Sequence, residues 1–297
     1  MDNIFVTFAL MVIRHPSDDS LFALVNEGPT KGWWLAGGGV DGHETFEQGA
    51  RREALEEAGV EVQPDAKLLQ IELGYHRLRY ILTGRAASRE LKYVPDKESM
   101  GAAWMTLKET ESIHRGTHNV PNSRLRGPEP VIWFKHLLRG GAVFDIDDVV
   151  DHLVEPGTTG LKYERRDVFN AKISCVIACQ VGGGKYVADT KEGSMRLPEA
   201  EPKLEWDESV EQCAARKLLQ MGYRNVIVRN VVRVRDHRMR NNTLDFRVGL
   251  FATAEIGTDG AFVLSEPEAF HDDFDRQIVD RINSGKILFP LTLLGIA

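Results

Sequence analysis

Two segments of this chain repeat one another, and that repeat constrains the fold more than any other feature of the sequence. Residues 44–53, ETFEQGARRE, align without a gap with residues 208–217, ESVEQCAARK. In both places β-rich runs precede the segment. At 297 residues the chain is long enough for two cores of ordinary domain size. The repeat therefore predicts two related domains in tandem.

The order of the predicted elements indicates an α/β arrangement in each half. In the first half we expect a motif helix at about 44–58, a closing helix at 131–138, and strands at 5–14, 21–26, 68–73, 77–84 and 102–106. In the second half, strands at 172–181 and 185–189 flank a turn of three glycines and precede a helix at 208–223. We place the first domain at 1–140, a connector at 141–168 and the second domain at 169–297.

A cluster of acidic residues in the motif helix suggests its chemistry. At about 100° per residue, Glu53, Glu56 and Glu57 fall within roughly 100° of one another. The other side of the helix, which we expect to face a core, carries Ala54, Leu55 and Ala58. Three neighbouring carboxylates tend to hold their protons unless a cation lies among them. Carboxylate oxygens suit Mg²⁺ or Mn²⁺, and Mg²⁺ usually takes a phosphate as a further ligand, so these residues indicate metal-dependent phosphate chemistry.

The segment from Gly38 to Val60 resembles the Nudix box, G-x5-E-x7-R-E-U-x-E-E-x-G-U, in which U is an aliphatic residue. Its fixed positions are occupied in register by Gly38, Glu44, Arg52, Glu53, Glu56, Glu57, Gly59 and Val60, and the smaller Ala54 stands at the first U. A solvated acidic helix is the alternative, but like charges four residues apart destabilise a helix. The resemblance implies two tandem Nudix-like α/β/α sandwich domains with mixed sheets, the second degenerate.

The resemblance also assigns roles within the box. The ligands implied for Mg²⁺ or Mn²⁺ are a backbone carbonyl at Gly38 and the carboxylates of Glu53, Glu56 and Glu57. Glu53 is alternatively the general base. Arg52 is expected to orient the glutamates, and Glu44 to brace the start of the helix. Gly59 stands where a left-handed C-cap would end the helix.

Residues outside the helix complete the predicted site. Gly37 and Gly39 let the backbone come close to metal and phosphate. Trp34 lies just before the glycines, where it would stack on a base, although tryptophans at a strand end are more often core residues. Glu98 lies on a loop just before the strand at 102–106 and is a candidate ligand or general base. A surface glutamate is the alternative interpretation of Glu98.

The second copy of the repeat lacks the predicted metal ligands. The positions of the three glutamates are occupied there by Lys217, Gln220 and Met221. A lysine and a methionine do not bind Mg²⁺, which takes oxygen ligands. We therefore predict one active site, in the first domain.

The two-domain arrangement is similar to that of Nudix enzymes that act on oxidised guanine nucleotides, particularly 8-oxo-guanosine diphosphates. The shared features are short: Leu91-Lys92, Asp96-Lys97-Glu98-Ser99, Trp104 and Arg235-Asp236-His237. The resemblance implies cleavage of a pyrophosphate bond in a nucleoside diphosphate derivative, with 8-oxo-(d)GDP or GTP as the first candidate. Diphosphoinositol polyphosphates, nucleotide sugars and RNA 5′ ends remain alternative substrates.

Composition and local charge bear on partners and location. A net charge of −7 gives no global sign of a nucleic-acid or membrane partner, and no apolar run reaches the length of a spanning helix. Arginines between Arg224 and Arg240 alternate in part with valines, which favours a solvated strand face over a groove for RNA or another polyanion. An RNA- or partner-binding protein acting through its second domain is the alternative of another class. Three cysteines without framework spacing favour a reducing, cytoplasmic setting.

Overall fold

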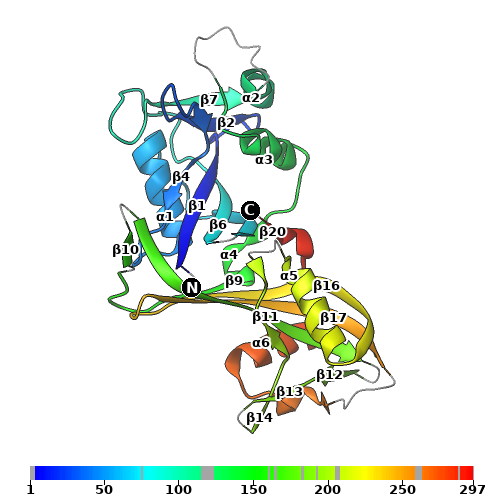
Figure 1. Ribbon diagram of the computed structural model, residues 1–297. Coiled ribbons are helices and arrows are strands. Elements are labelled where there is room, and N and C mark those ends of the chain that lie inside the picture. Colours follow the sequence, from blue (N-terminus) through cyan, green and yellow to red (C-terminus); the bar gives the residue numbers. More distant parts are fainter. Residues whose placement is uncertain are drawn as a thin grey trace.

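The computed structural model describes residues 4–74, 76–114, 124–159, 161–163, 166–181, 184–191, 193–204, 208–257, 263–286 and 288–296. Two halves lie one above the other (Figure 1), and all of their strands except the β13–β14 pair belong to one hydrogen-bonded network. Each half contains parallel and antiparallel strand pairs with helices against them. The structure confirms the mixed α/β class that the sequence predicts.

The first half is organised around a long central strand, β1. Its elements are β1 (Ile4–Arg14), β2 (Leu21–Asn26), β3 (Trp33–Trp34), β4 (Ala36–Gly39), α1 (Phe46–Glu53), the π-helical turn η1 (Ala54–Ala58), β5 (Lys67–Gly74), β6 (Arg77–Arg85), β7 (Ala102–Thr106), α2 (Leu107–His114) and α3 (Glu129–Leu138). β1 runs parallel to β6 and antiparallel to β4, so the sheet is mixed. The five strands predicted in this half form, with bounds that differ by at most one residue.

The second half repeats this organisation around β11. Its elements are β10 (Leu161–Tyr163), β11 (Arg166–Val181), β12 (Lys185–Val187), β13 (Asp189–Lys191), β14 (Ser194–Arg196), β15 (Glu199–Ala200), α5 (Val210–Gln220), β16 (Tyr223–Arg238), β17 (Thr243–Ile256), β18 (Leu264–Ser265), η4 (Pro267–Ala269) and α6 (Asp273–Asn283). The predicted helix at 208–223 is shorter in the structure because Ser209 caps its start and β16 begins at Tyr223. Gly182 and Gly183 of the predicted turn lie outside the described residues.

Strand pairing in the two halves follows the same register. β11 is parallel to β17 and antiparallel to β15, as β1 is to β6 and β4. The shift of 164 residues that aligns Glu44 with Glu208 also aligns the Met11–Ala36 pair of β1 and β4 with the Cys175–Ala200 pair of β11 and β15. A repeat first seen in a helix therefore extends to the hydrogen bonds of the sheet.

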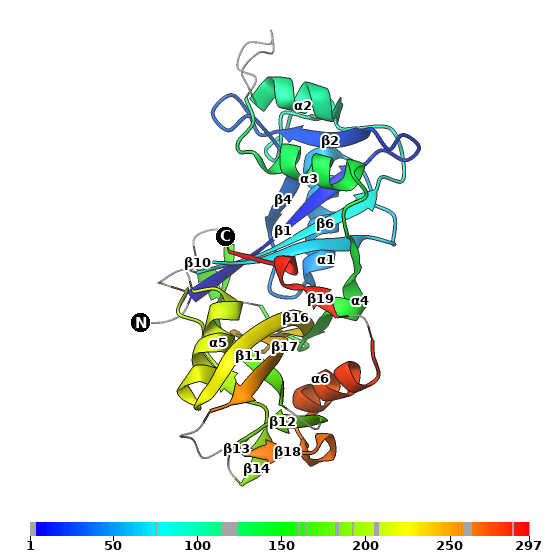
Figure 2. The same ribbon diagram turned by 90° about the vertical axis from the view of Figure 1, so that its right-hand side faces the viewer.

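The segments that follow α3 and α6 cross between the halves. They consist of β8 (Phe144–Asp145), α4 (Ile146–Val149) and β9 (Val150–Val154), and of β19 (Phe289–Pro290), η5 (Leu291–Leu293) and β20 (Leu294–Ile296). β8 pairs antiparallel with β5 of the first half, and β9 then pairs parallel with β16 of the second. β19 and β20 pair in the same way with β16 and then β5 (Figure 2). Residues 141–168, which we expected to be a connector with some packed structure, contain paired strands.

Buried apolar side chains form a core that runs through both halves. One cluster includes Ala9 and Phe46 from the first half together with Cys175 and Phe246 from the second. Phe46 of α1 stacks on Tyr80 of β6, with ring centroids 4.0 Å apart and an interplanar angle of 9°. Because α1 rests on this shared core, residues of the second half can influence where it lies.

Candidate active site

The position of α1 is set by interactions at both of its ends. At its start, the Thr45 hydroxyl accepts a hydrogen bond from the Gln48 amide and the Gln48 side chain accepts one from the Thr45 amide, a capping box. At the far end, Gly59 has φ 74° and closes the helical segment in the left-handed conformation. This confirms the predicted C-cap, since a residue with a side chain is strained there.

The helix does not continue as a regular α-helix through its glutamates. Residues Ala54–Ala58 form a π-helical turn, which is wider than an α-helical turn. Ala54 and Ala58 are buried as expected, but Leu55 is 51% exposed, so the prediction that it faces the core is wrong. The spacing of 100° per residue assumed for the glutamates does not hold either, because the π-helical turn includes Glu56 and Glu57. Glu57 is 8% exposed, whereas the Glu56 side chain is 42% exposed.

Arg52 lies at the centre of the acidic cluster. Its guanidinium donates to Glu44 at 2.9 and 3.1 Å, to Glu53 at 2.8 Å and to Glu56 at 3.0 Å. It also donates to the backbone carbonyl of Gly39 at 2.8 Å. Arg52 thus holds two carboxylates of the predicted metal site against the glycine strand, and its ion pairs raise its own pKa although burial opposes them. The same arginine keeps the pKa of Glu44 low despite the burial of that carboxyl group.

The glycine strand β4 comes into direct contact with the glutamates. The Gly37 amide donates to Glu57 at 2.9 Å. A Cβ atom on Gly38 would lie 2.4 Å from a carboxylate oxygen of Glu53, so a side chain there would displace that carboxylate. A Cβ atom on Gly39 would meet no atom within 4 Å. The structure therefore brings Gly37 and Gly38 against Glu57 and Glu53, while open space adjoins Gly39.

The surroundings of two glutamates, Glu53 and Glu57, disfavour the ionised form of their carboxyl groups. Burial, together with the charges of Glu53, Glu27 and Glu98, raises the pKa of Glu57 to about 8, although the hydrogen bond from the Gly37 amide opposes the shift. Burial also raises the pKa of Glu53, although its ion pair with the neighbouring arginine opposes that effect. Carboxyl oxygens in such surroundings fit a divalent cation, which would stabilise their ionised form.

The remaining predicted residues lie in different surroundings. The Glu98 side chain is 36% exposed and pairs with Lys97 at 3.0 Å, but its charge reaches both Glu53 and Glu57. Trp34 is 6% exposed and belongs to a core cluster, with the Arg126 guanidinium 5.7 Å from its ring centroid. The structure thus brings Glu98 toward the acidic cluster and places the Trp34 ring in the core, where no face of the ring is open for stacking.

Several residues at the site were missed by the sequence interpretation. Lys92 donates to the carbonyl of Glu56 at 2.7 Å, and the buried Ser99 hydroxyl donates to that of Glu57, also at 2.7 Å. An open groove of about 710 Å³ beside the end of η1 is lined by Gly59 and residues 90–94, including Tyr93, which is 88% exposed. Asp41, His43 and Glu44 form a further group whose possible ligand atoms lie within 4.8 Å of one another. Asp41 and His43 stand inside the motif, but spacing along the chain gave no signal for the loop residues.

The second half keeps the supporting ion pair of the first but not its glutamates. Arg216 donates to Glu208 at 2.6 and 2.9 Å, as Arg52 does to Glu44. Lys217, which stands at the position of Glu53, lies 3.4 Å from Asp189. The repeat therefore preserves the brace of the helix and replaces a carboxylate by an ammonium group.

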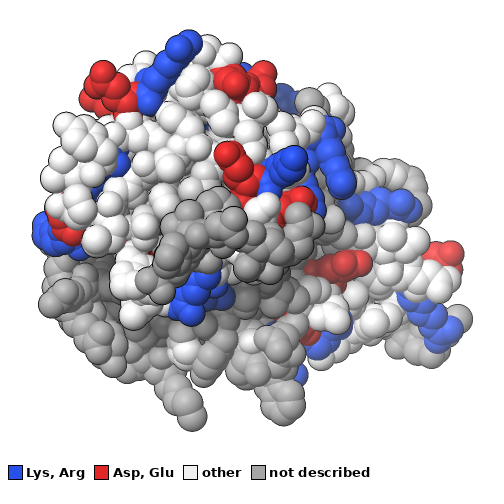
Figure 3. All heavy atoms as spheres, turned by 90° about the horizontal axis from the view of Figure 1, so that it is seen from above, with Lys and Arg blue, Asp and Glu red and all other residues white. Residues whose placement is uncertain are grey.

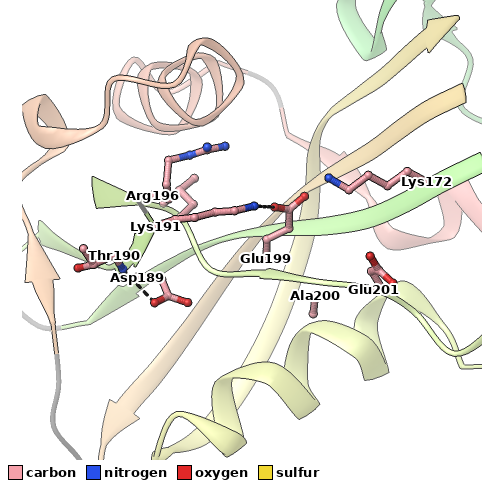
Figure 4. A pocket seen from close by; sticks show the side chains of 9 residues that line it. Lys172, Asp189, Thr190, Lys191, Arg196, Glu199, Ala200 and Glu201 are labelled. Carbon is pink, nitrogen blue, oxygen red and sulfur yellow. Dashed lines mark hydrogen bonds and ion pairs between the residues drawn. The ribbon is translucent and has the colours of Figure 1, made fainter. Parts of the chain in front are cut away.

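A cleft of about 280 Å³ lies beside this lysine, where β11, β13 and β15 approach one another (Figure 4). Basic and acidic side chains line it in equal number: Lys172, Lys191 and Arg196, and Asp189, Glu199 and Glu201. Lys191 lies 3.9 Å from Glu199, and Arg196 pairs with Asp275 of α6. The charges of this cleft are thus largely balanced within the protein.

The arginines of β16 are engaged by neighbouring groups. Arg235 pairs with Asp151 and Asp273, and Arg233 donates to the backbone carbonyls of residues 147 and 148. Arg238 is fully buried. On the face seen in Figure 3, basic and acidic side chains of the described residues lie interspersed. The predicted alternation is present, since Val232 and Val234 are buried, but Arg233 and Arg235 bind neighbouring groups and are only partly exposed.

Among the described residues, no helix is long and apolar enough to cross a membrane.

Comparison with known proteins agrees with the box. Residues 6–124 match the family model of the NUDIX domain. Putative nudix hydrolase 1 of Caenorhabditis elegans is 29% identical over 115 residues, which are 37% of this chain and 31% of that protein. The chain thus spans about a third of the length of this relative.

Solved structures of two bacterial proteins also align with about half of the chain. A NUDIX hydrolase from Nitrosomonas europaea has 21% identity and a TM-score of 0.36, over 48% of this chain and 94% of its own. A NUDIX-family hydrolase from Clostridium perfringens has 16% identity and a TM-score of 0.34, over 46% and 97%. Residues 6–124, which contain the box, are therefore similar to the NUDIX domain.

Proposed function

We propose that this protein is a metal-dependent pyrophosphohydrolase of nucleoside diphosphate derivatives. The observation that carries the proposal is the pair of glutamates beside the glycine strand, Glu53 and the buried Glu57, whose raised pKa values indicate that their ionised forms lack a compensating cation. Mg²⁺ or Mn²⁺, when bound by these carboxylates with Glu56 and the Gly38 carbonyl, supplies positive charge opposite the phosphoryl oxygens and acidifies water. Arg52 holds the carboxylates in place, since it contacts Glu53 and Glu56 together.

The general base is either Glu53 or Glu98. Glu98 is partly exposed, and its negative charge helps to raise the pKa of Glu57 in the acidic cluster. A carboxylate that is close to the cluster and open to solvent suits a group that takes a proton from water. Glu53 is held by Arg52, which suits a ligand better than a base. Glu98→Gln and Glu53→Gln variants separate the two roles. Loss of the base lowers kcat and leaves Mn²⁺ binding intact, whereas loss of a ligand weakens Mn²⁺ binding as well.

For the substrate, we propose an oxidised guanine nucleotide such as 8-oxo-(d)GDP or 8-oxo-(d)GTP. The groove beside η1 favours a ligand with a flat ring, because the exposed ring of Tyr93 can stack on a base there. Lys92 also lines the groove and donates to the carbonyl of Glu56, so the groove adjoins the acidic cluster. Diphosphoinositol polyphosphates, nucleotide sugars and RNA 5′ ends are the alternatives. Tyr93→Ala is expected to raise KM for a nucleotide and to leave KM for a diphosphoinositol unchanged.

A substrate panel tests this proposal directly. Purified protein is incubated with Mg²⁺ or Mn²⁺ and 8-oxo-dGDP, 8-oxo-dGTP, dGDP, dGTP, ADP-ribose, a diphosphoinositol or triphosphate-ended RNA. We expect that EDTA and Glu56→Gln abolish hydrolysis. Glu208→Gln, which changes the counterpart of Glu44 in the second half, is expected to leave hydrolysis unchanged. Failure to hydrolyse any of these compounds would refute the enzymatic proposal. Equal rates for oxidised and unoxidised nucleotides would refute the substrate class alone.

We also propose that the second half is a degenerate copy of the NUDIX domain. The shared register of the sheets and the Arg216–Glu208 ion pair support a common origin. The replacement of Glu53 by Lys217 supports the loss of metal chemistry. RNA or partner binding by this half is the alternative function. It would appear as salt-dependent binding that survives Glu56→Gln, and the ion pairs of Arg235 argue against it.

A further inference from the structure

A cluster of buried polar side chains joins the second half to the start of α1. Its members are Tyr80 of β6, His152 of β9, and Asp236 and Arg238 of β16. The carboxylate of Asp236 accepts a hydrogen bond from Tyr80 and lies 3.4 Å from Nε of Arg238 and 3.6 Å from Nδ1 of His152. Asp236 and Arg238 are fully buried. The cluster therefore places a charged pair from the second half in contact with the first.

Arg238 extends this cluster to the loop that precedes α1. Its Nη1 atom donates to the backbone carbonyl of Glu44 at 3.1 Å and of Asp41 at 3.3 Å. The Glu44 carboxylate accepts hydrogen bonds from Arg52, which in turn holds Glu53. A continuous series of polar contacts thus leads from a buried arginine of the second half to the carboxylates proposed to hold metal.

The repeat provides an internal comparison for this cluster. Pairing on β16 places Asp236 opposite His152 and Phe246, and pairing on β5 places Ile71 opposite Leu294 and Tyr80. The counterparts of Asp236, Arg238, His152 and Tyr80 in the other half are therefore Ile71, Leu73, Leu294 and Phe246. All four counterparts are apolar. Among the described residues, the polar cluster thus lies beside the helix that carries the three glutamates, and the equivalent positions beside α5 are apolar.

The difference between the polar cluster and its apolar counterparts is not explained by stability. A buried ion pair seldom stabilises a fold more than well-packed apolar residues of similar size, because both charges lose their hydration. The apolar counterparts show that the architecture has such a solution at equivalent positions. What the apolar set lacks is a donor for the two loop carbonyls. Directional hydrogen bonds to the loop are thus the property that distinguishes the polar cluster.

We propose that Arg238 is a positioning residue through which the second half fixes residues 41–44 and the start of α1, and thereby the glutamates of the first half. This inference rests on the proposed function for its kinetic consequences. Asp236, which accepts a hydrogen bond from Tyr80, holds the guanidinium in the orientation that reaches Asp41 and Glu44. The degenerate half accordingly contributes to catalysis without touching the substrate.

The test compares variants of the full-length chain in hydrolysis, Mn²⁺ binding by calorimetry, and thermal unfolding. Arg238→Lys keeps the charge but cannot donate to Asp236 and to both carbonyls in the same geometry. We expect it to lower kcat at least about tenfold and to weaken Mn²⁺ binding, with KM for the nucleotide nearly unchanged. Arg233→Lys, on the same strand and bonded to carbonyls remote from α1, is expected to leave all three measurements close to wild type.

A second pair of variants separates positioning from stability. Val234→Ala removes buried apolar volume from the same strand and is expected to lower the melting temperature without weakening Mn²⁺ binding. Asp236→Asn with Arg238→Gln removes both buried charges, so it keeps the test valid if Arg238→Lys fails to fold. We expect this double variant to weaken Mn²⁺ binding as well.

The outcomes are distinguishable. Unchanged Mn²⁺ binding and kcat in Arg238→Lys, or an equal loss of Mn²⁺ binding in Val234→Ala at the same melting temperature, would overturn the positioning role. If wild-type protein hydrolyses none of the substrates, the proposed function fails, and the Mn²⁺ titrations still decide whether Arg238 positions the loop.

Discussion

Glu57 is expected to destabilise the metal-free protein, and this can be measured. The carboxyl group is 8% exposed, and its pKa is raised from 4.5 to about 8, chiefly by burial. Between these two pH values the carboxyl group ionises in the unfolded chain but stays protonated in the folded one. The unfolded state then binds fewer protons, so stability falls as pH rises from about 4.5 to 8.

The size of the effect follows from the pKa difference. At pH 7 the solution is about 2.5 pH units above the pKa of the unfolded carboxyl group, while the folded carboxyl group is mostly protonated. The difference lowers the free energy of unfolding by about 3 kcal/mol. Glu57→Gln removes this penalty but replaces the carboxyl oxygen that accepts a hydrogen bond from the Gly37 amide by a side-chain amide oxygen, whose different geometry offsets part of the gain. We therefore expect a net gain of about 1–3 kcal/mol, or a rise in melting temperature of roughly 2–8 °C.

Differential scanning calorimetry in EDTA at pH 5 and pH 8 tests this reasoning. The melting temperatures of Glu57→Gln and wild type should nearly coincide at pH 5, with the variant clearly higher at pH 8. Mg²⁺ should then stabilise wild type more than the variant, since only wild type gains a charged ligand. A variant that melts below wild type at pH 8, or a difference that does not depend on pH, would refute the assigned surroundings of Glu57.

Three further predictions concern the first half, the repeat and the thiols. Gly38→Ala should lower kcat about 100-fold with a small change in melting temperature, because its Cβ would lie 2.4 Å from the Glu53 carboxylate; activity within twofold of wild type contradicts this. Glu44→Gln and Glu208→Gln should lower the melting temperature similarly, by a few degrees, yet only Glu44→Gln should reduce kcat; equal kinetic losses would show that the second half also catalyses. Burial raises the pKa of the Cys179 thiol to about 12, so it should react with a thiol reagent only after unfolding, and rapid modification of that residue in native protein would contradict its burial.

The strands and caps were predictable because the forces that fix them are local. Alternating and β-branched residues predicted five strands of the first half to within one residue, although not the short β3 and β4, and Gly59 ends the helical segment as expected. The π-helical turn was not predictable from a 100° spacing. It leaves Leu55 half exposed and separates Glu56 from Glu57, because the wider turn changes the direction of each following side chain.

The placement of individual site residues depended on more than their position in the motif. Trp34 follows the pattern of a stacking residue in sequence, yet the packing of α3 and neighbouring strands leaves it in the core. Lys92 and Ser99 contact the end of η1 from a loop more than thirty residues away. These contacts form only when the loop folds back onto η1, and the spacing of residues in the sequence does not predict that fold.

The sequence by itself determined the box, its repeat and the loss of the three glutamates in the second copy, because each is a pattern of nearby residue types. Only the tertiary structure decided how the halves cooperate. The exchange of β9 and β20 between the sheets brings Arg238 to the carbonyl of Glu44, 194 residues earlier in the chain. A contact of that separation exists only when both sheets are folded and paired. For that reason the contribution of the second half is decided by packing and hydrogen-bond geometry, and is not encoded in any local motif.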